Sequence, residues 1–360
     1  MNTRKHLVIL IAVMASLASF LAGYLFTRPQ QPGALNQQHG DILDRFMGIR
    51  SANNASQQQN GLAQIASDPV LSAASDGASD SILYYHRDNG FVSQVQLASQ
   101  KNTLISSTGL PHLVGVSWSP DATKVLASYD SPNGTLYKSF DYKTRSGTTL
   151  GTDIAGAVFS PDSSSIALAK TSGEETDVVI ARTDGTEPRT ILKTHLQNVS
   201  LFWQSDHALS FVSQDLSQPN PTMILFVVTD DGDLTKIVAD QPNLNIRWSP
   251  DGSLLLYSTR TNDRPELHLL NVTTGTDRTI DLPATADNCA WHMNNSSFVC
   301  VAEGPDSTSI VSVTTSDLSS KTLFADLIFS PENVFLSHLE DFVVLVSRTD
   351  HTIWSAPLSD

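Results

Sequence analysis

The chain has 360 residues and is strongly acidic, with 37 Asp and Glu against 22 Lys and Arg and a formal charge of −15. Residues 66–360 contain 35 acidic and 17 basic residues, a charge of −18, so the whole negative excess lies in this part of the chain. No basic stripe exists to neutralise phosphates, so we expect no binding to nucleic acid. The same charge would repel an anionic membrane surface.

The N-terminal segment, residues 1–27, predicts a membrane anchor. Leu7 to Phe26 carries no charge, and at about 1.5 Å per residue it can cross roughly 30 Å of hydrocarbon as a transmembrane helix. Arg4 and Lys5 precede it, which predicts a cytoplasmic N-terminus and an extracytoplasmic remainder, periplasmic or at the cell surface. The alternative is a cleaved secretory signal with a small-residue site at 16–18.

Residues 28–60 are rich in Gln, Asn, Gly and Pro. This composition lacks the apolar residues that a packed core needs, so we predict a flexible linker. The linker would hold the rest of the chain away from the membrane.

The remainder, residues 61–360, is built from repeats. Ser-Pro followed by an acidic residue occurs after an aromatic residue at 118–121, 159–162, 248–251 and 329–332, and weaker copies fill the gaps. The aromatic position gives the repeat markers Ala73, Trp118, Phe159, Trp203, Trp248, Trp291 and Phe329. The steps between them are 45, 41, 44, 45, 43 and 38 residues. This period, with strand-like content, predicts a β-propeller with one four-stranded blade per repeat.

One repeat shows the expected strands clearly. Residues 245–248 and 254–258 form two apolar strands separated by Ser-Pro-Asp-Gly, a sequence suited to a tight turn. Residues 266–272 form a third strand, and the outermost strand, 277–282, alternates between polar and apolar residues. Such a gradient is typical of a blade whose inner strands are buried between neighbouring blades. The marker tryptophans are therefore expected to be core residues.

Residues 325–358 supply only three strands, at 326–329, 342–347 and 352–356. We predict that 61–67 provides the missing outer strand, because this closes the ring and leaves no open edge. Seven blades follow. Six or eight would require ignoring a marker or adding one.

The two cysteines are candidates for a disulfide. Cys289 lies on an expected inner strand and Cys300 on the next strand of the same repeat. A two- or four-residue loop would put them directly opposite each other, whereas a three-residue loop would place them on opposite faces. An exported protein favours oxidation. The alternative is a pair of buried free thiols.

Catalytic motifs are not recognisable. The ten histidines are scattered, without the short spacings of a zinc site, and we predict neither a metal nor a cofactor. The loops that enter the inner strands could line the mouth of the central channel with a mixed polar ring rather than an obvious ligand set. This ring, the candidate binding site, consists of His112, Asp153, Gln197, Asn243 and Asp287.

The repeats resemble those of TolB-type, WD-like bacterial β-propellers. The resemblance is carried by Val116–Asp121, Val158–Asp162 and Arg247–Gly252 and covers roughly residues 61–360. It departs from true WD repeats, which contain Gly-His and Trp-Asp dipeptides, and it includes no counterpart of TolB's separate N-terminal domain. Similar propellers accompany prolyl-oligopeptidase-type peptidases, whose hydrolase domain also has no counterpart here. The resemblance implies a platform for binding.

We therefore predict a membrane-tethered, monomeric propeller that binds protein or cell-envelope partners without catalysis. The alternative is a propeller enzyme, a metal-assisted hydrolase, lyase or lactonase acting at the central channel. Metal analysis of the purified protein would separate the two, because bound calcium or zinc would favour the enzyme.

Overall fold

The computed structural model describes residues 58–59, 61–196, 198–205, 208–215, 221–261, 264–305 and 307–358. The chain divides into two compact units, residues 1–55 and 56–360, and the described residues belong to the second. Within them, no helix combines the length and apolar character needed to cross a membrane. The predicted anchor lies outside the described residues, as does the predicted linker apart from 58–59.

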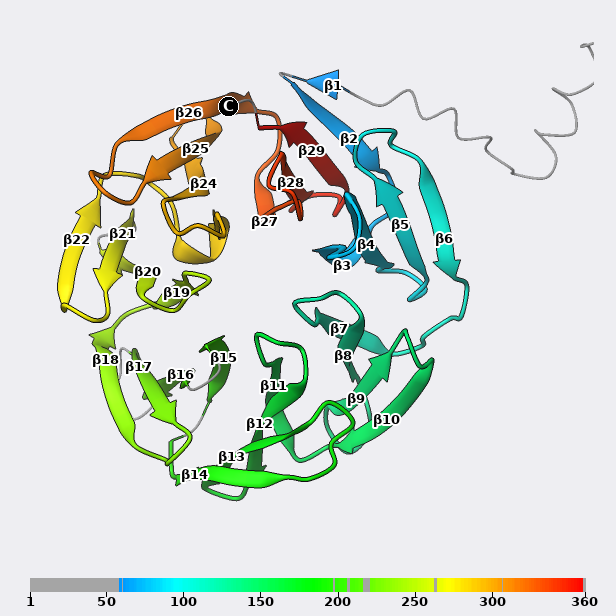
Figure 1. Ribbon diagram of the computed structural model, residues 1–360, viewed down its shortest axis with the longest axis vertical. Coiled ribbons are helices and arrows are strands. Elements are labelled where there is room, and N and C mark those ends of the chain that lie inside the picture. Colours follow the sequence, from blue (N-terminus) through cyan, green and yellow to red (C-terminus); the bar gives the residue numbers. More distant parts are fainter. Residues whose placement is uncertain are drawn as a thin grey trace, which may run out of the picture. The chain divides into compact units, whose positions relative to one another are not determined.

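The second unit is an all-β propeller of seven antiparallel sheets arranged around a central axis (Figure 1). From the inner strand outwards, blade 1 contains β3 (Val70–Ser75), β4 (Ser81–His86), β5 (Val92–Gln96) and β6 (Asn102–Ser106). Blade 2 contains β7 (Leu113–Trp118), β8 (Lys124–Tyr129), β9 (Leu136–Asp141) and β10 (Ser146–Gly151). Blade 3 contains β11 (Ile154–Phe159), β12 (Ser165–Ser172), β13 (Glu175–Arg182) and β14 (Arg189–Thr194).

Blade 4 contains β15 (Ser200–Ser205), β16 (Ala208–Asp215), β17 (Thr222–Thr229) and β18 (Leu234–Gln241). Blade 5 contains β19 (Asn245–Trp248), β20 (Leu254–Thr261), β21 (Arg264–Asn271) and β22 (Thr276–Ile280). Blade 6 contains β23 (Cys289–Trp291), β24 (Ser297–Glu303), β25 (Thr308–Thr314) and β26 (Ser320–Leu327), with the 3₁₀ helix η1 (Ala286–Asn288) before β23. Blade 7 contains β27 (Pro331–Leu336), β28 (Phe342–Ser347), β29 (Ile353–Pro357), β2 (Leu62–Ala66) and β1 (Gln58–Gln59).

The ring is closed by β2, as predicted. This strand pairs antiparallel with β29 through Ala63–Ser355 and Gln64–Trp354. Its two faces pack differently: Leu62 joins a cluster of blades 6 and 7, and Ile65 joins one of blades 7 and 1. Seven blades and the closing strand are thereby confirmed.

The repeat markers at both ends of the propeller were placed wrongly. Residues 326–329 are not the inner strand of blade 7, because β26 ends at Leu327 and the inner strand is β27. Ser330-Pro331-Glu332 therefore starts a strand instead of forming a turn, and proline is tolerated at the first residue of a strand. A marker at Leu336 lies 45 residues after Trp291, in line with the other repeats. In blade 1, the marker is Ser75 and not Ala73, because β3 ends at Ser75 and the inner strands of most blades end at their marker.

The Ser-Pro-Asp turns owe their recurrence to a small hydrogen-bond network. In blade 2, Ser119 Oγ donates to Asp121 (2.7 Å) and accepts the Lys124 N–H (2.9 Å). Burial tends to raise the pKa of Asp121, but hydrogen bonds from Ser119 and Thr123 outweigh it and lower the pKa to about 2. The motif thus holds each inner strand to its neighbour at one face of the ring.

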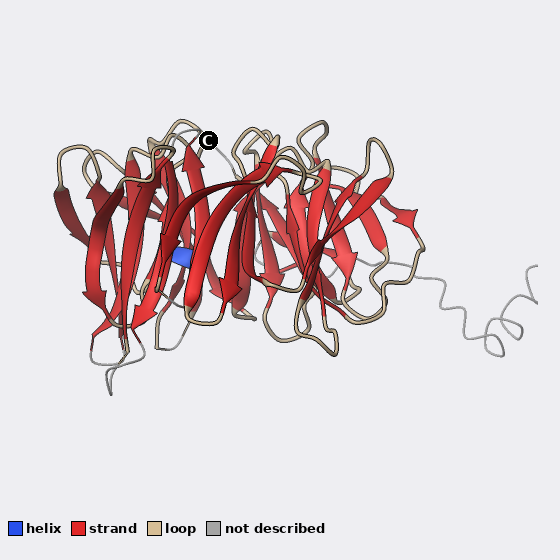
Figure 2. Ribbon diagram, turned by 90° about the horizontal axis from the view of Figure 1, so that it is seen from below, coloured by secondary structure: helices blue, strands red, loops and turns tan. Residues whose placement is uncertain are grey.

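The inner strands cross the ring from one face to the other, and the loops gather at the two faces (Figure 2). We call the face on which the inner strands begin the mouth face. Two of the marker tryptophans, which we expected in the core, form hydrogen bonds to the preceding blade. Trp248 Nε1 donates to Ser210 Oγ of blade 4 (2.9 Å), and Trp291 Nε1 donates to the Arg247 carbonyl of blade 5 (3.2 Å).

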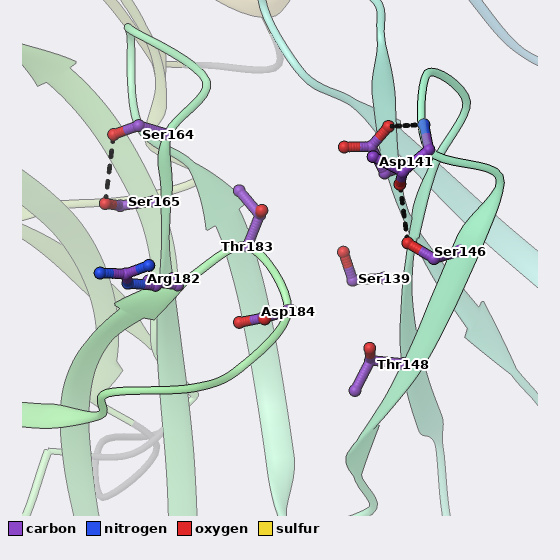
Figure 3. Close-up of a pocket in the computed structure, with 10 residues that line it drawn as sticks. Ser139, Asp141, Ser146, Thr148, Ser164, Ser165, Arg182, Thr183 and Asp184 are labelled. Carbon is purple, nitrogen blue, oxygen red and sulfur yellow. Dashed lines mark hydrogen bonds between the residues drawn. The ribbon is translucent and has the colours of Figure 1, made fainter.

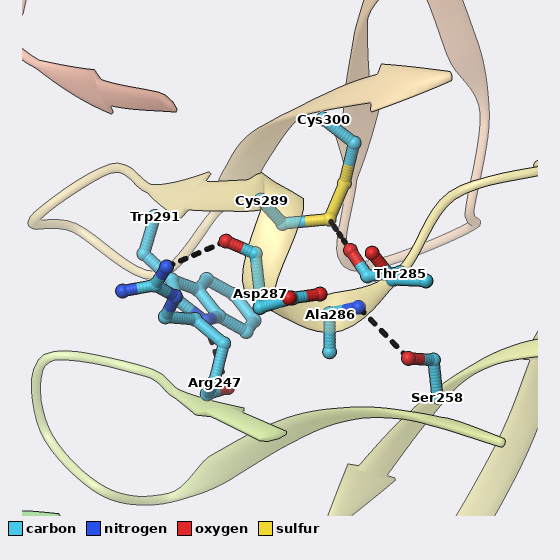
Figure 4. The surroundings of a disulfide bond; sticks show 8 residues. All are labelled: Arg247, Ser258, Thr285, Ala286, Asp287, Cys289, Trp291 and Cys300. Atoms are coloured by element: carbon cyan, nitrogen blue, oxygen red, sulfur yellow. Dashed lines mark hydrogen bonds between the residues drawn. A yellow bond between two sulfur atoms is a disulfide. The ribbon is translucent and has the colours of Figure 1, made fainter. Parts of the chain in front are cut away.

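Blade 6 carries the disulfide. Cys289 and Cys300 stand directly opposite each other on β23 and β24, and their sulfur atoms are bonded at 1.98 Å (Figure 4). Both residues are fully buried. The Trp291–Phe298 pair continues the same register toward the hairpin. The bond therefore links the two inner strands of a blade whose turn has no Pro-Asp-Gly sequence.

Candidate active site at the seam of the ring

The predicted ring of mouth residues lies where the inner strands begin. His112 and Asp153 directly precede β7 and β11, Asn243 lies two residues before β19, and Asp287 belongs to η1. Gln197 lies outside the described residues. The four described positions belong to blades 2, 3, 5 and 6, one in each.

Two of these four residues have polar partners outside the ring. Asp153 accepts a hydrogen bond from Lys170 Nζ (3.2 Å), and the Asp287 carbonyl accepts one from Arg247 Nη2 (2.7 Å). Among the described residues, no hydrogen bond or ion pair joins one predicted position to another. A shared binding role for the ring therefore stays a prediction.

A denser group lies on the mouth face where blade 7 meets its two neighbours. Glu332, the second residue of β27, accepts a hydrogen bond from Nδ1 of His351 (2.8 Å). The exposed fractions of the two side chains are 30% and 27%, so a ligand can reach them. An imidazole that donates through Nδ1 to a carboxylate presents the lone pair of Nε2 as a base.

His351 has a left-handed backbone conformation. It sits in the β28–β29 turn with φ of +58°, where its N–H bonds to the Ser347 carbonyl. The equivalent turn of blade 1 has Gly90 there, with φ of +73° and the same bond to His86. Glycine adopts this conformation readily. Thirteen other non-glycine residues among those described also have a positive φ, and histidine is one of the residue types enriched there, so the turn positions the side chain and does not by itself indicate function.

The side chain of Arg87 lies beside this pair. Arg87, in the β4–β5 turn of blade 1, has Nη2 at 3.8 Å from Glu332 Oε1 and at 3.3 Å from His351 Nδ1. Its Nε donates to the Val70 carbonyl (3.3 Å). Main-chain bonding fixes the junction, since the Val70 N–H donates to the His351 carbonyl (2.9 Å). Blades 1 and 7 are thus joined at the histidine itself.

On the other side, Arg348 reaches toward blade 6. Its Nη2 donates to the Pro331 carbonyl (3.3 Å) and lies 3.6 Å from Glu303 Oε1. Glu303 also accepts a hydrogen bond from Ser330 Oγ (2.6 Å). We call Arg87, Glu303, Glu332, Arg348 and His351 the seam cluster.

Sequence reasoning missed the seam cluster because of the misplaced marker. With Ser330-Pro331-Glu332 taken as a turn, Glu332 was assigned to the face opposite the mouth. The available signal was a repeated position at or just after the end of the second strand of a blade, occupied here by Arg87, Glu303 and Arg348. Their backbone N–H groups bond to the carbonyls of Pro69, Pro283 and Ser330, in the segments that lead to the inner strands. The same position is also charged in blades 2 and 5, at Asp130 and Arg260, so it predicts charge on the mouth face and not one particular site.

A second, hydroxyl-rich groove of about 540 Å³ lies between blades 2 and 3 (Figure 3). Its lining residues are Ser139, Asp141, Thr144, Ser146, Thr148, Ser164, Ser165, Arg182, Thr183 and Asp184. The charged groups already have partners. Asp141 accepts the N–H groups of Lys143 and Thr144, and Arg182 pairs with Glu187 at 2.9 Å. The groove has no histidine, so the seam cluster is the stronger candidate for catalysis.

Solved structures of other proteins share this fold. An oligogalacturonate lyase in complex with manganese has a TM-score of 0.64 and 11% identity over 83% of this chain and 93% of that one. The oligogalacturonate lyase of Vibrio parahaemolyticus has a TM-score of 0.61 and 14% identity, covering 83% and 94%. The propeller domain of the Trilobed protease of Pyrococcus furiosus is described as having an open velcro topology. It has a TM-score of 0.57 and 13% identity, over 81% of this chain and 95% of that one.

At these identities, the likeness shows the fold alone, which 1128 matching chains share. No protein family model and no curated protein sequence matches the chain. The resemblance to TolB-type proteins therefore extends to a seven-bladed propeller, and membership of that family is not shown.

The prediction of a non-catalytic binding platform is contradicted by the two lyases. It rested on the lack of a catalytic motif or separate catalytic domain. In the lyases, however, the region similar to this propeller covers 93% and 94% of the chain, so a propeller of this kind can be an enzyme by itself. The accompanying expectation that the chain is not an enzyme is likewise not confirmed.

Manganese in the first lyase raises the question of a metal site here. The described residues include no group of three or more His, Cys, Asp or Glu side chains arranged to hold a metal ion. In the seam cluster, the carboxylates of Glu332 and Glu303 face arginines, which disfavour a cation. The residues present therefore do not fit manganese, and we route no step through a metal.

Proposed function

We propose that the chain is a lyase that cleaves uronate-containing oligosaccharides at the seam cluster. The observation that carries the proposal is a histidine oriented by a carboxylate, His351 on Glu332 at 2.8 Å, beside the guanidinium group of Arg87. A second guanidinium group, that of Arg348, binds the carbonyl of Pro331, the residue before Glu332. A base beside cations is the arrangement that proton removal next to a carboxylate requires. The likeness to the oligogalacturonate lyases supports this reaction class.

The proposed reaction is a β-elimination. His351 Nε2 takes the proton from the sugar carbon that bears the carboxylate. The electrons of that C–H bond form a carbon–carbon double bond to the neighbouring carbon, whose bond to the glycosidic oxygen breaks. The departing oxygen takes a proton from solvent and becomes a hydroxyl group, and His351 Nε2 releases the proton that it removed to solvent, so the products contain no added water.

The arginines would bind the substrate carboxylate and stabilise the negative charge that develops on it. Arg87 and Arg348 use Nε or Nη2 for their contacts, and among the described residues neither has a hydrogen-bond partner for Nη1. These donors are available to a carboxylate, which guanidinium groups bind with two parallel hydrogen bonds. Glu332 acts as a positioning residue that holds the required tautomer of the base.

The direct test is the kinetics of the full chain on oligogalacturonate, followed by the absorbance of the unsaturated product. His351→Gln removes the base and should lower kcat by about 10² or more with a small change in KM, the usual contribution of a general base. Glu332→Gln should lower kcat less and shift the pH–rate profile. The matched control is His338→Gln, at an exposed histidine in the β27–β28 turn on the opposite face.

Two results would contradict the proposal. One is a His351→Gln variant that is as active as the unsubstituted chain. The other is an unsubstituted chain that cleaves no uronate oligomer. Equal losses in the His351 and His338 variants would also separate the activity from the seam cluster.

A further inference from the structure

A second cation stands at the mouth, outside the seam cluster. Arg247 is the third residue of β19. Its Nε is buried without a hydrogen-bond partner, and its Nη2 donates to the Asp287 carbonyl (2.7 Å). Burial lowers the pKa of the guanidinium group, and the nearby charge of Asp287 opposes that shift. Among the described residues, no carboxylate forms an ion pair with this arginine. A partly buried cation with an unused donor is costly, so its presence calls for a reason.

The surroundings place this guanidinium group beside the seam cluster. Asp287, whose carbonyl accepts the hydrogen bond from Arg247, belongs to η1 of blade 6. Trp291, also of blade 6, donates a hydrogen bond to the Arg247 carbonyl (Figure 4). The helix η1 packs against both β19, which carries Arg247, and β27, which carries Glu332. Arg247 and the seam cluster therefore lie on the two sides of η1.

We propose that Arg247 is a second carboxylate-binding point for the same acidic oligosaccharide. This inference rests on the proposed function, because it assumes that the seam cluster binds one uronate unit. A chain of uronate units carries a carboxylate on every sugar, so a substrate that crosses η1 presents a further carboxylate on the blade 5 side. A guanidinium group without an ion-pair partner is suited to bind it.

Asp287 gives the proposal a second, opposite prediction. Arg247 bonds to the main-chain carbonyl of Asp287, and the exposed side chain of the same residue carries a negative charge. A bound carboxylate would be repelled by it. Asp287→Asn should therefore tighten the binding of a long acidic oligomer, whereas Arg247→Gln should weaken it.

The test measures binding by calorimetry with digalacturonate and tetragalacturonate, in full-length protein that carries His351→Gln to prevent turnover. Arg247→Gln should weaken the binding of tetragalacturonate by about tenfold, the factor that corresponds to ~1.4 kcal/mol. The affinity for digalacturonate should stay within about twofold. Arg247→Lys should recover part of the loss. The matched control is Arg189→Gln, on outer strand β14, where the arginine pairs with Asp230 at 3.6 Å.

The possible outcomes are distinguishable. Unchanged tetragalacturonate binding in Arg247→Gln overturns the inference and leaves the proposed function standing. Equal weakening of both oligomers, together with a lower melting temperature, makes Arg247 a structural residue and also overturns it. If the protein without the arginine change binds neither oligomer, the proposed function itself fails.

Discussion

The closing strand β2 offers a quantitative test of the ring. Leu62 and Ile65 are only 2% and 3% exposed, and they pack into different clusters on the two faces of the strand. Replacing a buried Leu or Ile by Ala removes apolar contacts and leaves a cavity, which costs about 3 kcal/mol. For a domain of this size, ~3 kcal/mol corresponds to a decrease of roughly 6 °C in Tm.

The two substitutions should add, because their side chains pack into different clusters on opposite faces of the strand. The double variant Leu62→Ala/Ile65→Ala should therefore lose about twice as much Tm as either single variant. The matched controls are Leu104→Ala and Ile105→Ala on β6, the outer strand of blade 1, whose side chains are 54% and 47% exposed. Surface substitutions of this kind change stability by about 0.5 kcal/mol or less.

Thermal unfolding of the full-length variants, followed by circular dichroism, measures the effect. If Leu62→Ala and Ile65→Ala shift Tm no more than the two β6 controls, β2 does not close the ring. The blade count would then also be in error, since blade 7 would lack its outer strand.

Three further predictions concern the disulfide, a turn and the N-terminus. Replacing Cys289 and Cys300 by Ala should lower the free energy of unfolding by about 3 kcal/mol on the chain-entropy model. Alkylation of denatured, unreduced protein should label neither cysteine, and two labelled thiols would contradict the bond. Asp121→Asn should lower Tm above about pH 4, and the difference should vanish as the pH falls toward 2, because the folded-state pKa is depressed; a pH-independent difference would refute this. We propose that residues 1–27 anchor the chain, so a reporter active only after export, fused after Asp360, should be active and sediment with membranes; a soluble mature form would show cleavage.

The fold could be predicted because the repeat encodes one physical unit many times. The Ser-Pro-Asp turn appears with its hydrogen bonds at Ser119, Ser160 and Ser249, and each copy is followed by a buried strand. The strand register at Cys289 and Cys300 could be predicted in the same way, because a hairpin loop of suitable length places the two residues opposite each other. These features are local, and local patterns are visible in a sequence.

The candidate site could not be predicted because it depends on contacts between distant segments. Arg87 and His351 are separated by 264 positions, and they meet only because the ring closes. The Ser-Pro-Glu sequence at 330–332 also looks like the turn motif, whereas tertiary pairing with β28 makes it the start of a strand. An identical motif can thus occupy opposite faces of the ring, and only the pairing of Pro331 with Ser347 distinguishes them.

The central claim is that the seam cluster breaks a glycosidic bond by elimination. Mass spectrometry of the products formed from oligogalacturonate in ¹⁸O-labelled water tests it most directly. We predict two products whose masses add up to that of the substrate, one of them unsaturated and neither labelled, and no products with the His351→Gln variant. Incorporation of ¹⁸O together with the mass of one water would show hydrolysis instead, and uncleaved substrate would contradict the claim.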